Sequence, residues 1–379
     1  MPPTDKLKKS RRLVLKRGIV LSALLAGGIG STQAGDYSNL YFFGDSITDS
    51  GTFINVARAL SPSVPNGHFS TKPGNVWSEN LGARYGKSVS AGFIAYLANP
   101  PVYLPIGGNN LAVGDAQINS IPANHGPLPS VKMQVDQFLS RGAVDPKALY
   151  AMWAGGNDIF AQFVSGAGAS PSAAAMSALV TAAGDMSTQI LRLQSAGVRN
   201  LIVVGAMDMT KSPSGLALGA ADLAQLGTLM NTFDTNQKAQ LAGKNLLYFD
   251  MVKFNRQILA NPLAYGFTDT TTAACGATNV LICDVLPDGH MYADVRHPST
   301  LLHQVISDWI YSSLEGASRI GLLSQVPMGR SGAQWRSIDA RLREFQNFGY
   351  QGQGFFVTGD YASSDRDAYA GSPSAQGSG

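Results

Sequence analysis

Ser46 is the residue in this sequence whose surroundings best suit nucleophilic chemistry. It lies in Gly44-Asp45-Ser46-Ile47, directly after the apolar run 40–43. Glycine permits the sharp turn that would present a serine hydroxyl at the end of a strand. A turn serine that hydrogen-bonds its own backbone is the alternative interpretation.

A serine hydroxyl attacks a carbonyl only when a base removes its proton, and that base is most often a histidine oriented by a carboxylate. Two histidines follow an acid closely: His297 comes three residues after Asp294, and His290 comes two residues after Asp288. We favour His297, because a carboxylate three residues earlier can reach the imidazole across a tight turn. His290 with Asp288 remains the rival pair.

Acyl transfer also requires hydrogen-bond donors where the oxyanion develops. Segment 109–114 ends in Gly114, whose backbone N–H could serve, and Asn157 follows the apolar run 148–153. Each segment could equally be an ordinary turn. Gly114 and Asn157 therefore gain meaning only together with Ser46 and His297.

The elements that must position these residues alternate between strands and helices. Apolar periodicity predicts helices from Ser170, as the cap, to Gly197, and at 220–241 and 298–314. Short apolar runs predict buried strands at 40–43, 148–153, 201–204 and 246–249. This alternation favours a parallel sheet covered by helices on both faces, with the reactive groups at the carboxyl ends of the strands.

The charge distribution excludes a nucleic-acid partner. The whole chain of 379 residues carries a net charge of +3. Residues 1–34 account for more than this net charge, because they hold seven Lys or Arg and one acid. Residues 35–379 therefore carry −3, which cannot neutralise phosphates. The sequence also lacks an HExxH zinc motif, a complete P-loop and a dinucleotide loop, so we expect no metal and no cofactor.

Residues 1–34 predict an export signal, because a basic segment is followed by an apolar stretch at 18–29 and small residues before Ala34. About twelve apolar residues are too few for the ~20 of a membrane-spanning helix. The arginine pair Arg11-Arg12 also resembles a twin-arginine signal, so both export routes stay open. We expect an exported protein that is secreted, periplasmic or displayed at the outer membrane.

Export would decide the oxidation state of the two cysteines of the chain. Cys275 and Cys283 would reach an oxidising compartment and could close a nine-residue loop. We expect a disulfide between them, with two unrelated buried thiols as the alternative.

Taken together, four blocks of the sequence resemble the GDSL, or SGNH, family of serine esterases and lipases. Ile47 stands where the name-giving leucine is usual, and the resemblance covers roughly residues 38–315. The blocks occur in the family's order: Gly44-Asp45-Ser46, Gly114, Gly155-Gly156-Asn157-Asp158 and Asp294-x-x-His297-Pro298. The resemblance implies an α/β fold, a three-layer α/β/α flavodoxin-like sandwich with a parallel sheet.

The same resemblance implies roles for the site residues. Ser46 would be the nucleophile, His297 the general base and then acid, and Asp294 the group that fixes the imidazole tautomer. The backbone N–H groups of Ser46 and Gly114, with the side chain of Asn157, would form the oxyanion hole. The expected function is hydrolysis of an acyl ester or lipid through an acyl-enzyme. An acyltransferase or phospholipase with the same intermediate, and a surface-displayed binding passenger without turnover, are the alternatives.

Composition changes after the hydrolase domain, which we expect at 35–316. Residues 317–345 predict a helical linker, and an apolar run at 354–361 predicts a strand. This order resembles the junction before the translocator of autotransporter esterases. Residues 346–379 would thus be an incomplete β-domain, with possible outer-membrane association if the native protein is longer, or a tail with a disordered Gly/Ser-rich end.

One apolar insertion, at 91–104, lies between the first two blocks. It is a candidate wall for the substrate's acyl chain, with ordinary core packing as the alternative.

Overall fold

A computed structural model describes residues 37–63, 66–122, 126–166, 170–323, 363–366 and 375–378. The chain divides into two compact units, Tyr37–Ser312 and a second made of Met1–Asp36 with Ser313–Gly379. The expected export signal at 1–34 lies outside the described residues. Among the helices that are described, none is both long enough and apolar enough to span a bilayer.

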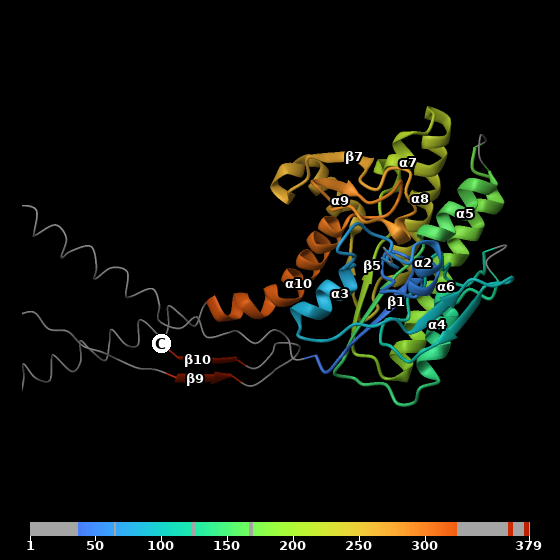
Figure 1. Cartoon of the computed structure of the whole chain (residues 1–379). Coiled ribbons are helices and arrows are strands. Elements are labelled where there is room, and N and C mark those ends of the chain that lie inside the picture. Colours follow the sequence, from blue (N-terminus) through green and yellow to red (C-terminus); the bar gives the residue numbers. More distant parts are fainter. Residues whose placement is uncertain are drawn as a thin grey trace, which may run out of the picture. The chain divides into compact units, whose positions relative to one another are not determined.

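A four-stranded parallel sheet forms the centre of the unit Tyr37–Ser312 (Figure 1). Its strands coincide with the four predicted apolar runs to within one residue at each end. In spatial order they are β1 (Leu40–Gly44), β4 (Leu149–Trp153), β5 (Asn200–Val204) and β6 (Leu247–Phe249). Leu40 of β1 pairs with Leu149 of β4, which pairs in turn with Asn200 of β5.

The chain also runs along the outer edge of β1. The N–H of Phe42 donates to Asn109 O at 3.0 Å, and the N–H of Leu111 donates to Phe42 O at 2.8 Å. After β1, the chain first returns as segment 109–111 on one side of this strand. It later returns as β4 on the other side. Ligands of open α/β sheets bind at such a switch point, beyond the carboxyl ends of the strands.

Helices cover both faces of the sheet, which explains why its strands are apolar along their whole length. On one face lie α4 (Val131–Leu139), α6 (Ala173–Ala196) and α8 (Ala220–Leu241), and on the other lie α3 (Trp77–Arg84), α9 (Met251–Ala260) and α10 (Thr300–Leu323) (Figure 1). Successive side chains of β1 serve opposite layers: Phe43 packs edge-on against Phe138 of α4, and Phe42 packs edge-on against Trp77 of α3. The predicted three-layer α/β/α sandwich is therefore confirmed.

Smaller elements surround the carboxyl edge of the sheet. The helices are α2 (Ile54–Leu60), α5 (Gly156–Ser165) and α7 (Pro213–Leu216), with single 3₁₀ turns at Met209–Lys211, Pro262–Tyr265 and Val280–Ile282. β2 (Phe93–Tyr96) and β3 (Val102–Pro105) pair antiparallel, and β7 (Asp269–Ala273) pairs with β8 (His290–Tyr292) in parallel.

Two helices differ from the prediction at their boundaries. Helix α6 is capped by Ser172, whose side chain accepts a hydrogen bond from the N–H of Ala175, and Ser170 is not the cap. Its other end agrees with the prediction, since Gly197 adopts a left-handed φ of 118°. Helix α10 begins at Thr300 and extends to Leu323, past the predicted end at 314.

In the second unit, β9 (Ser363–Arg366) and β10 (Ala375–Ser378) form an antiparallel pair. Residues 375–378 of the Gly/Ser-rich end therefore lie in a strand, where the sequence predicts disorder. The strand predicted at 354–361, and the linker residues beyond 323, lie outside the described part of the chain.

Candidate active site

Ser46 follows β1 at the switch point of the sheet, in a turn that depends on Gly44. Gly44 has a φ of +150°, and a Cβ there would collide with the carbonyl oxygen of Trp153 in β4. The side chain of Gln134, from α4, holds both backbone groups of Gly44: its Oε1 accepts from N at 2.9 Å and its Nε2 donates to O at 2.8 Å. The chain therefore leaves the strand in one defined direction.

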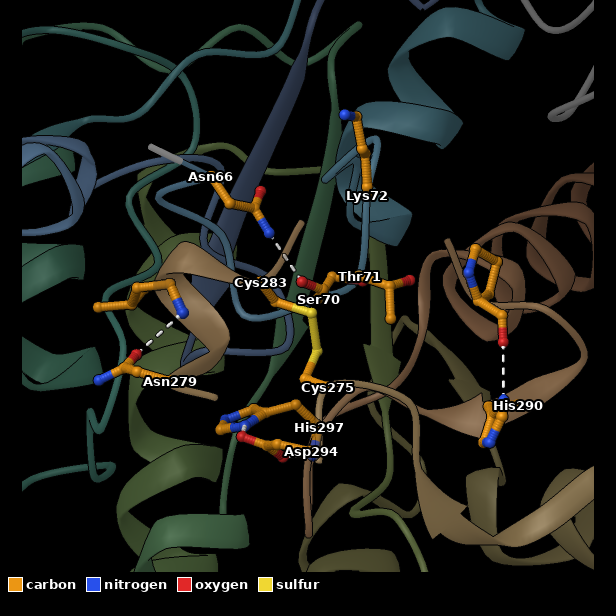
Figure 2. The surroundings of a disulfide bond; sticks show 12 residues. Asn66, Ser70, Thr71, Lys72, Cys275, Asn279, Cys283, His290, Asp294 and His297 are labelled. Carbon is orange, nitrogen blue, oxygen red and sulfur yellow. Dashed lines mark hydrogen bonds and ion pairs between the residues drawn. A yellow bond between two sulfur atoms is a disulfide. The ribbon is translucent and has the colours of Figure 1, made fainter. Parts of the chain in front are cut away.

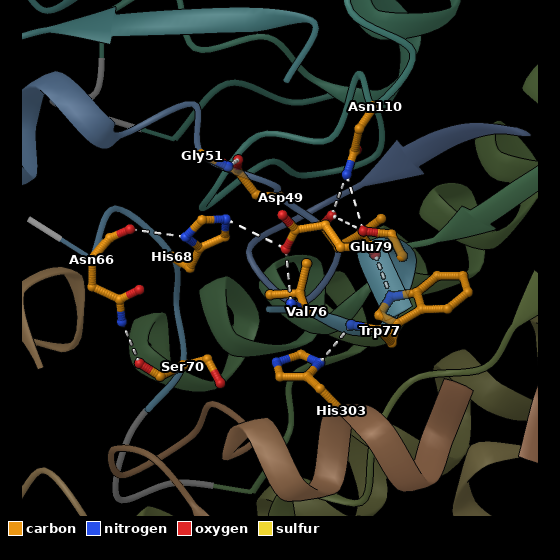
Figure 3. Close-up of polar contacts among 12 residues, drawn as sticks. Asp49, Gly51, Asn66, His68, Ser70, Val76, Trp77, Glu79, Asn110 and His303 are labelled. Atoms are coloured by element: carbon orange, nitrogen blue, oxygen red, sulfur yellow. Dashed lines mark hydrogen bonds and ion pairs between the residues drawn. The ribbon is translucent and has the colours of Figure 1, made fainter. Parts of the chain in front are cut away.

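Side chains of α3 and of the segment along the edge of β1 hold the turn after Ser46, and Figure 3 labels two of them, Trp77 and Asn110. The carbonyl oxygen of Thr48 accepts from Asn110 Nδ2 at 2.6 Å and from Ser78 Oγ at 2.9 Å. The indole Nε1 of Trp77 donates to Thr48 Oγ1 at 3.1 Å. All four of these side chains are buried, so the nucleophile loop is rigid.

His297 and Asp294 lie on a tight loop between β8 and α10 (Figure 2). The loop is closed at its base, where Ala293 N donates to His297 O at 2.8 Å. Inside the loop, Asp294 Oδ1 accepts from the backbone N–H of Arg296 at 2.8 Å and of His297 at 2.7 Å. This local turn holds carboxylate and imidazole together, as the three-residue spacing predicts.

The structure joins Ser46, His297 and Asp294 into one hydrogen-bonded relay. Asp294 Oδ2 lies 2.7 Å from His297 Nδ1, and His297 Nε2 lies 2.9 Å from Ser46 Oγ. Burial alone would raise the pKa of Asp294, but the His297 charge and the hydrogen bonds from His297 and Arg296 outweigh it and hold this pKa well below its usual range. Asp294 is then a carboxylate that accepts from Nδ1–H, which leaves Nε2 to accept the Ser46 hydroxyl proton.

The rival histidine lies elsewhere. His290 Nδ1 lies 3.1 Å from Pro287 O, and its Nε2 lies 3.6 Å from Asp269 Oδ2. The alternative pairing of His290 with Asp288 is therefore not formed.

Two further contacts steady the histidine loop. The ring of Phe69 packs against the imidazole of His297, with centroids 5.0 Å apart. The predicted disulfide between Cys275 and Cys283 is present, and the N–H of Cys275 donates to Ala293 O at 2.8 Å, next to Asp294 (Figure 2).

Asn157 reaches the same site from the start of α5. Gly155, in front of this helix, has a φ of +113°, and a Cβ there would collide with the ring of Phe233. One amide hydrogen of Asn157 is donated to Ala116 O at 3.1 Å. The amide has a second hydrogen, and Asn157 lines one pocket together with Ser46 and His297.

The N–H of Gly114, the expected third oxyanion donor, already has a partner inside the protein. It donates to Asp49 Oδ2 at 2.9 Å. The next residue, Asp115, lines the pocket and has a left-handed φ of 62°. The partner of the Gly114 N–H is Asp49, which follows the first block, Gly44-Asp45-Ser46, by three residues and faces Gly114 in the folded chain.

Asp49 connects the nucleophile loop to the segment around Gly114. Its Oδ1 accepts from the N–H of Gly51 at 2.9 Å and of Thr52 at 2.8 Å, while Oδ2 accepts from Gly114. Burial raises the pKa of Asp49 to about 6, although these hydrogen bonds oppose the shift. Burial likewise raises the pKa of Asp45 to about 7 and of Asp158 to about 7.

The pocket above Ser46 has mixed walls. It is lined by Asp45, Ser46, Ile47, Asp115, Trp153, Gly156, Asn157, Phe160, Ala206, Met207, Met209, Arg296 and His297. The apolar and aromatic side chains can contact an acyl group, and the charged side chains can contact polar groups of a substrate. Residues 91–104, the candidate acyl wall, are not among these; they form the β2–β3 hairpin, on which Leu97 is 63% exposed.

Three supporting residues were not found from the sequence. Asp49 stands just after the first block, three residues beyond Ser46. Gln134 is a buried polar residue on the apolar face of α4, which is the kind of exception that signals a specific hydrogen bond. Phe69 carries no signal in the sequence. In the described part of the chain, no group of three His, Cys, Asp or Glu side chains could hold a metal ion.

The chain matches the model of a known protein family over most of its length. The model of the family described as GDSL-like Lipase/Acylhydrolase matches residues 40–310. Lipase 1 of Photorhabdus luminescens is 23% identical, over 92% of this chain and 61% of that protein. Esterase EstA of Pseudomonas aeruginosa is 27% identical, over 94% of this chain and 60% of that protein.

A third relative differs in its name. Phosphatidylcholine-sterol acyltransferase of Aeromonas hydrophila is 25% identical, over 66% of this chain and 70% of that protein. The chain thus spans about 60% of the length of the lipase and of the esterase.

Proposed function

This chain belongs to the GDSL-like lipase/acylhydrolase family, and from that premise we propose that it is a serine esterase that hydrolyses acyl esters through an acyl-enzyme on Ser46. The observation that carries the proposal is the continuous relay from Ser46 Oγ to His297 Nε2, at 2.9 Å, and from Nδ1 to Asp294, at 2.7 Å. A serine, a histidine and a carboxylate in this order have the geometry of nucleophilic acyl transfer.

In the first half-reaction, Ser46 Oγ forms a bond to the ester carbonyl carbon while its proton passes to His297 Nε2. The carbonyl oxygen becomes negative, and the backbone N–H of Ser46 with the second amide hydrogen of Asn157 can donate to it. The tetrahedral intermediate collapses when His297 returns the proton to the leaving alcohol. Asp294 stabilises the imidazolium that exists between these two transfers.

In the second half-reaction, a water molecule takes the place of the alcohol. It gives a proton to His297 Nε2, attacks the acyl carbon, and releases the acid when the proton returns to Ser46 Oγ. The same groups therefore act twice, and the proton moves in each half-reaction through His297 Nε2.

Hydrolysis of p-nitrophenyl esters from acetyl to palmitoyl tests the proposal, with the full chain compared with its Ser46→Ala variant. We expect turnover by the wild type and a loss of about a millionfold in the variant, because removal of the nucleophile in serine hydrolases has such an effect. The preferred chain length would define the acyl group that the pocket accepts. A folded wild-type chain without turnover on any ester would favour the binding-passenger alternative.

Acyl transfer to an alcohol is the second candidate, favoured by the similarity to the Aeromonas acyltransferase. The acyl-enzyme is common to both reactions, and only the acceptor differs. Product analysis with and without an added alcohol separates them: a new ester at the expense of free acid identifies a transferase.

We also propose that the enzyme acts outside the cytoplasm. Support comes from the basic and apolar pattern of residues 1–34 and from the disulfide Cys275–Cys283, since disulfides persist in oxidising compartments. Fractionation of cells that express the full chain, with activity measured in each fraction, tests this proposal.

A further inference from the structure

Arg296 is a charged residue of the active-site pocket that the reaction above does not use. It stands between Asp294 and His297 in the sequence, and it lines the pocket with Ser46 and Asn157. Its backbone N–H belongs to the turn around Asp294, but its side chain is exposed and extends to Phe160 of α5. The guanidinium is therefore placed beside the pocket without taking part in the relay.

The side chain of Arg296 is held by an aromatic ring. Its Cζ lies 4.2 Å from the centroid of the Phe160 ring, close enough for a cation–π contact. A cation–π contact uses none of the guanidinium N–H groups as hydrogen-bond donors to a carboxylate, so these groups are left for a ligand. Because the planar group is weakly hydrated and already positioned, it loses little on binding an anion.

Arg296 also differs from other arginines of the chain in its ion pairing. Within the residues described by the structure, no carboxylate forms an ion pair with it, whereas Arg192 pairs with Asp136 and Arg84 pairs with Asp308. A guanidinium beside a pocket, held by a cation–π contact and outside the ion pairs of the described residues, suits an oxyanion with two oxygens that can accept in parallel.

Asp115 supplies the opposite charge on the same pocket. It lines the same pocket as Arg296 and has a left-handed φ of 62°. Repulsion from Asp115 would weaken the binding of an anion, so the two residues must act in opposite directions on a charged substrate. Substitutions of Asp115 and of Arg296 should therefore change the preference for an anionic substrate in opposite directions.

We propose that Arg296 is a specificity-determining residue that binds an anionic oxygen group of the substrate, phosphate or carboxylate, beside the ester that Ser46 attacks. The inference rests on the proposed esterase function and narrows its substrate class to esters that carry such a group. The competing explanation is structural: the contact with Phe160 would only tether the histidine loop to α5.

Two matched pairs of substrates separate these explanations and identify the anion. Dihexanoylglycerophosphate and dihexanoylglycerol share acyl chains and differ in the phosphate. The monoester of glutaric acid with p-nitrophenol and p-nitrophenyl pentanoate share a five-carbon acyl group and differ in the carboxylate. The measured quantity is the ratio of kcat/KM for the anionic member of each pair to kcat/KM for the neutral member.

We expect Arg296→Gln to lower this ratio about tenfold in at least one pair, the usual weight of a charge-assisted hydrogen bond at a partly exposed site. A loss with the phosphate pair identifies a phosphate-bearing lipid, and a loss with the carboxylate pair identifies an acidic ester. Asp115→Asn, which tolerates the left-handed backbone, should raise the same ratio by up to about fivefold. Arg199→Gln, at an exposed residue before the amino end of β5, is the matched control and should leave the ratio unchanged.

A ratio within about twofold of the wild type in both pairs, whether or not overall activity falls, would overturn the proposal and leave the tether explanation. Absence of wild-type turnover on every one of the four esters would instead contradict the esterase function itself. The two failures are therefore distinguishable.

Discussion

His297 Nε2 lies 2.9 Å from Ser46 Oγ, although the two residues are 251 positions apart in the chain. Ser46 arrives at this contact from the carboxyl end of β1, and His297 arrives from the loop between β8 and α10. Asp294 travels with His297 on the same loop, so a single long-range approach assembles the complete relay. The consequences of this arrangement can be measured.

Substitution of Asp294 tests the orientation of the base. In Asp294→Asn, the amide cannot hold the imidazole in the tautomer that accepts from Ser46, so kcat should fall by about 10³ to 10⁴ with little change in KM. Steady-state kinetics on a soluble p-nitrophenyl ester measures both constants. Asp288→Asn, in the rival pair that is not formed, should retain wild-type kcat. If Asp294→Asn turned over normally, another acid would have to orient His297.

Substitution of Asp49 tests the link between the nucleophile loop and the segment around Gly114. In Asp49→Asn, one oxygen can still accept from Gly51 and Thr52, but the amide NH₂ then faces the N–H of Gly114, donor against donor. We expect the free energy of unfolding to fall by about 1 to 3 kcal/mol, and kcat to fall because the pocket wall at Asp115 shifts.

Denaturant unfolding and kinetics together measure these two effects. Asp145→Asn is the matched control, because that carboxylate also accepts from a backbone N–H and a hydroxyl but precedes β4 at the opposite edge of the sheet. It should change stability without changing kcat. Equal kcat in Asp49→Asn and the wild type would contradict the proposed link.

The buried carboxyl of Asp158 should make stability depend on pH. Burial raises its pKa in the folded chain to about 7, against ~3.9 when unfolded. Between these two values the folded state binds more protons, so the free energy of unfolding must decrease as the pH rises. Asp158→Asn removes this titration and can still accept from the N–H of Ile118.

Denaturant titrations at pH 5 and pH 8 test this expectation. The wild type should lose about 2 to 3 kcal/mol more than Asp158→Asn between the two pH values. Asp288→Asn, at an exposed position, should lose as much as the wild type. Parallel losses in all three proteins would show that Asp158 is ionised throughout.

The disulfide should stabilise both the fold and the catalytic loop. Replacing Cys275 and Cys283 together by serine should lower the free energy of unfolding by about 2 to 3 kcal/mol, by the loop-entropy estimate. Because Cys275 N–H binds the carbonyl of Ala293, next to Asp294, we also expect a severalfold decrease in kcat. Reduced wild-type protein should behave like the double variant. Peptide mapping without reductant checks the bond directly, and free thiols in exported protein would refute it.

The sequence by itself determined the features that depend on near neighbours along the chain. The four apolar runs became the four strands of the parallel sheet, because a strand buried on both faces must be apolar throughout. The pairing of Asp294 with His297 was predictable, since a carboxylate three residues earlier closes a local turn. The nine-residue loop between Cys275 and Cys283 was predictable for the same reason.

Only the tertiary structure decided which distant groups face one another. Spacing alone left His290 as a rival, and the fold excluded it because the loop after β8 brings His297, and not His290, to Ser46. Packing also directed the N–H of Gly114 to Asp49, 65 positions away, and thereby placed Asp115 in the pocket. Periodicity and turn chemistry act over a few residues, whereas the partner of a buried donor is chosen by how whole layers pack, which no local pattern contains.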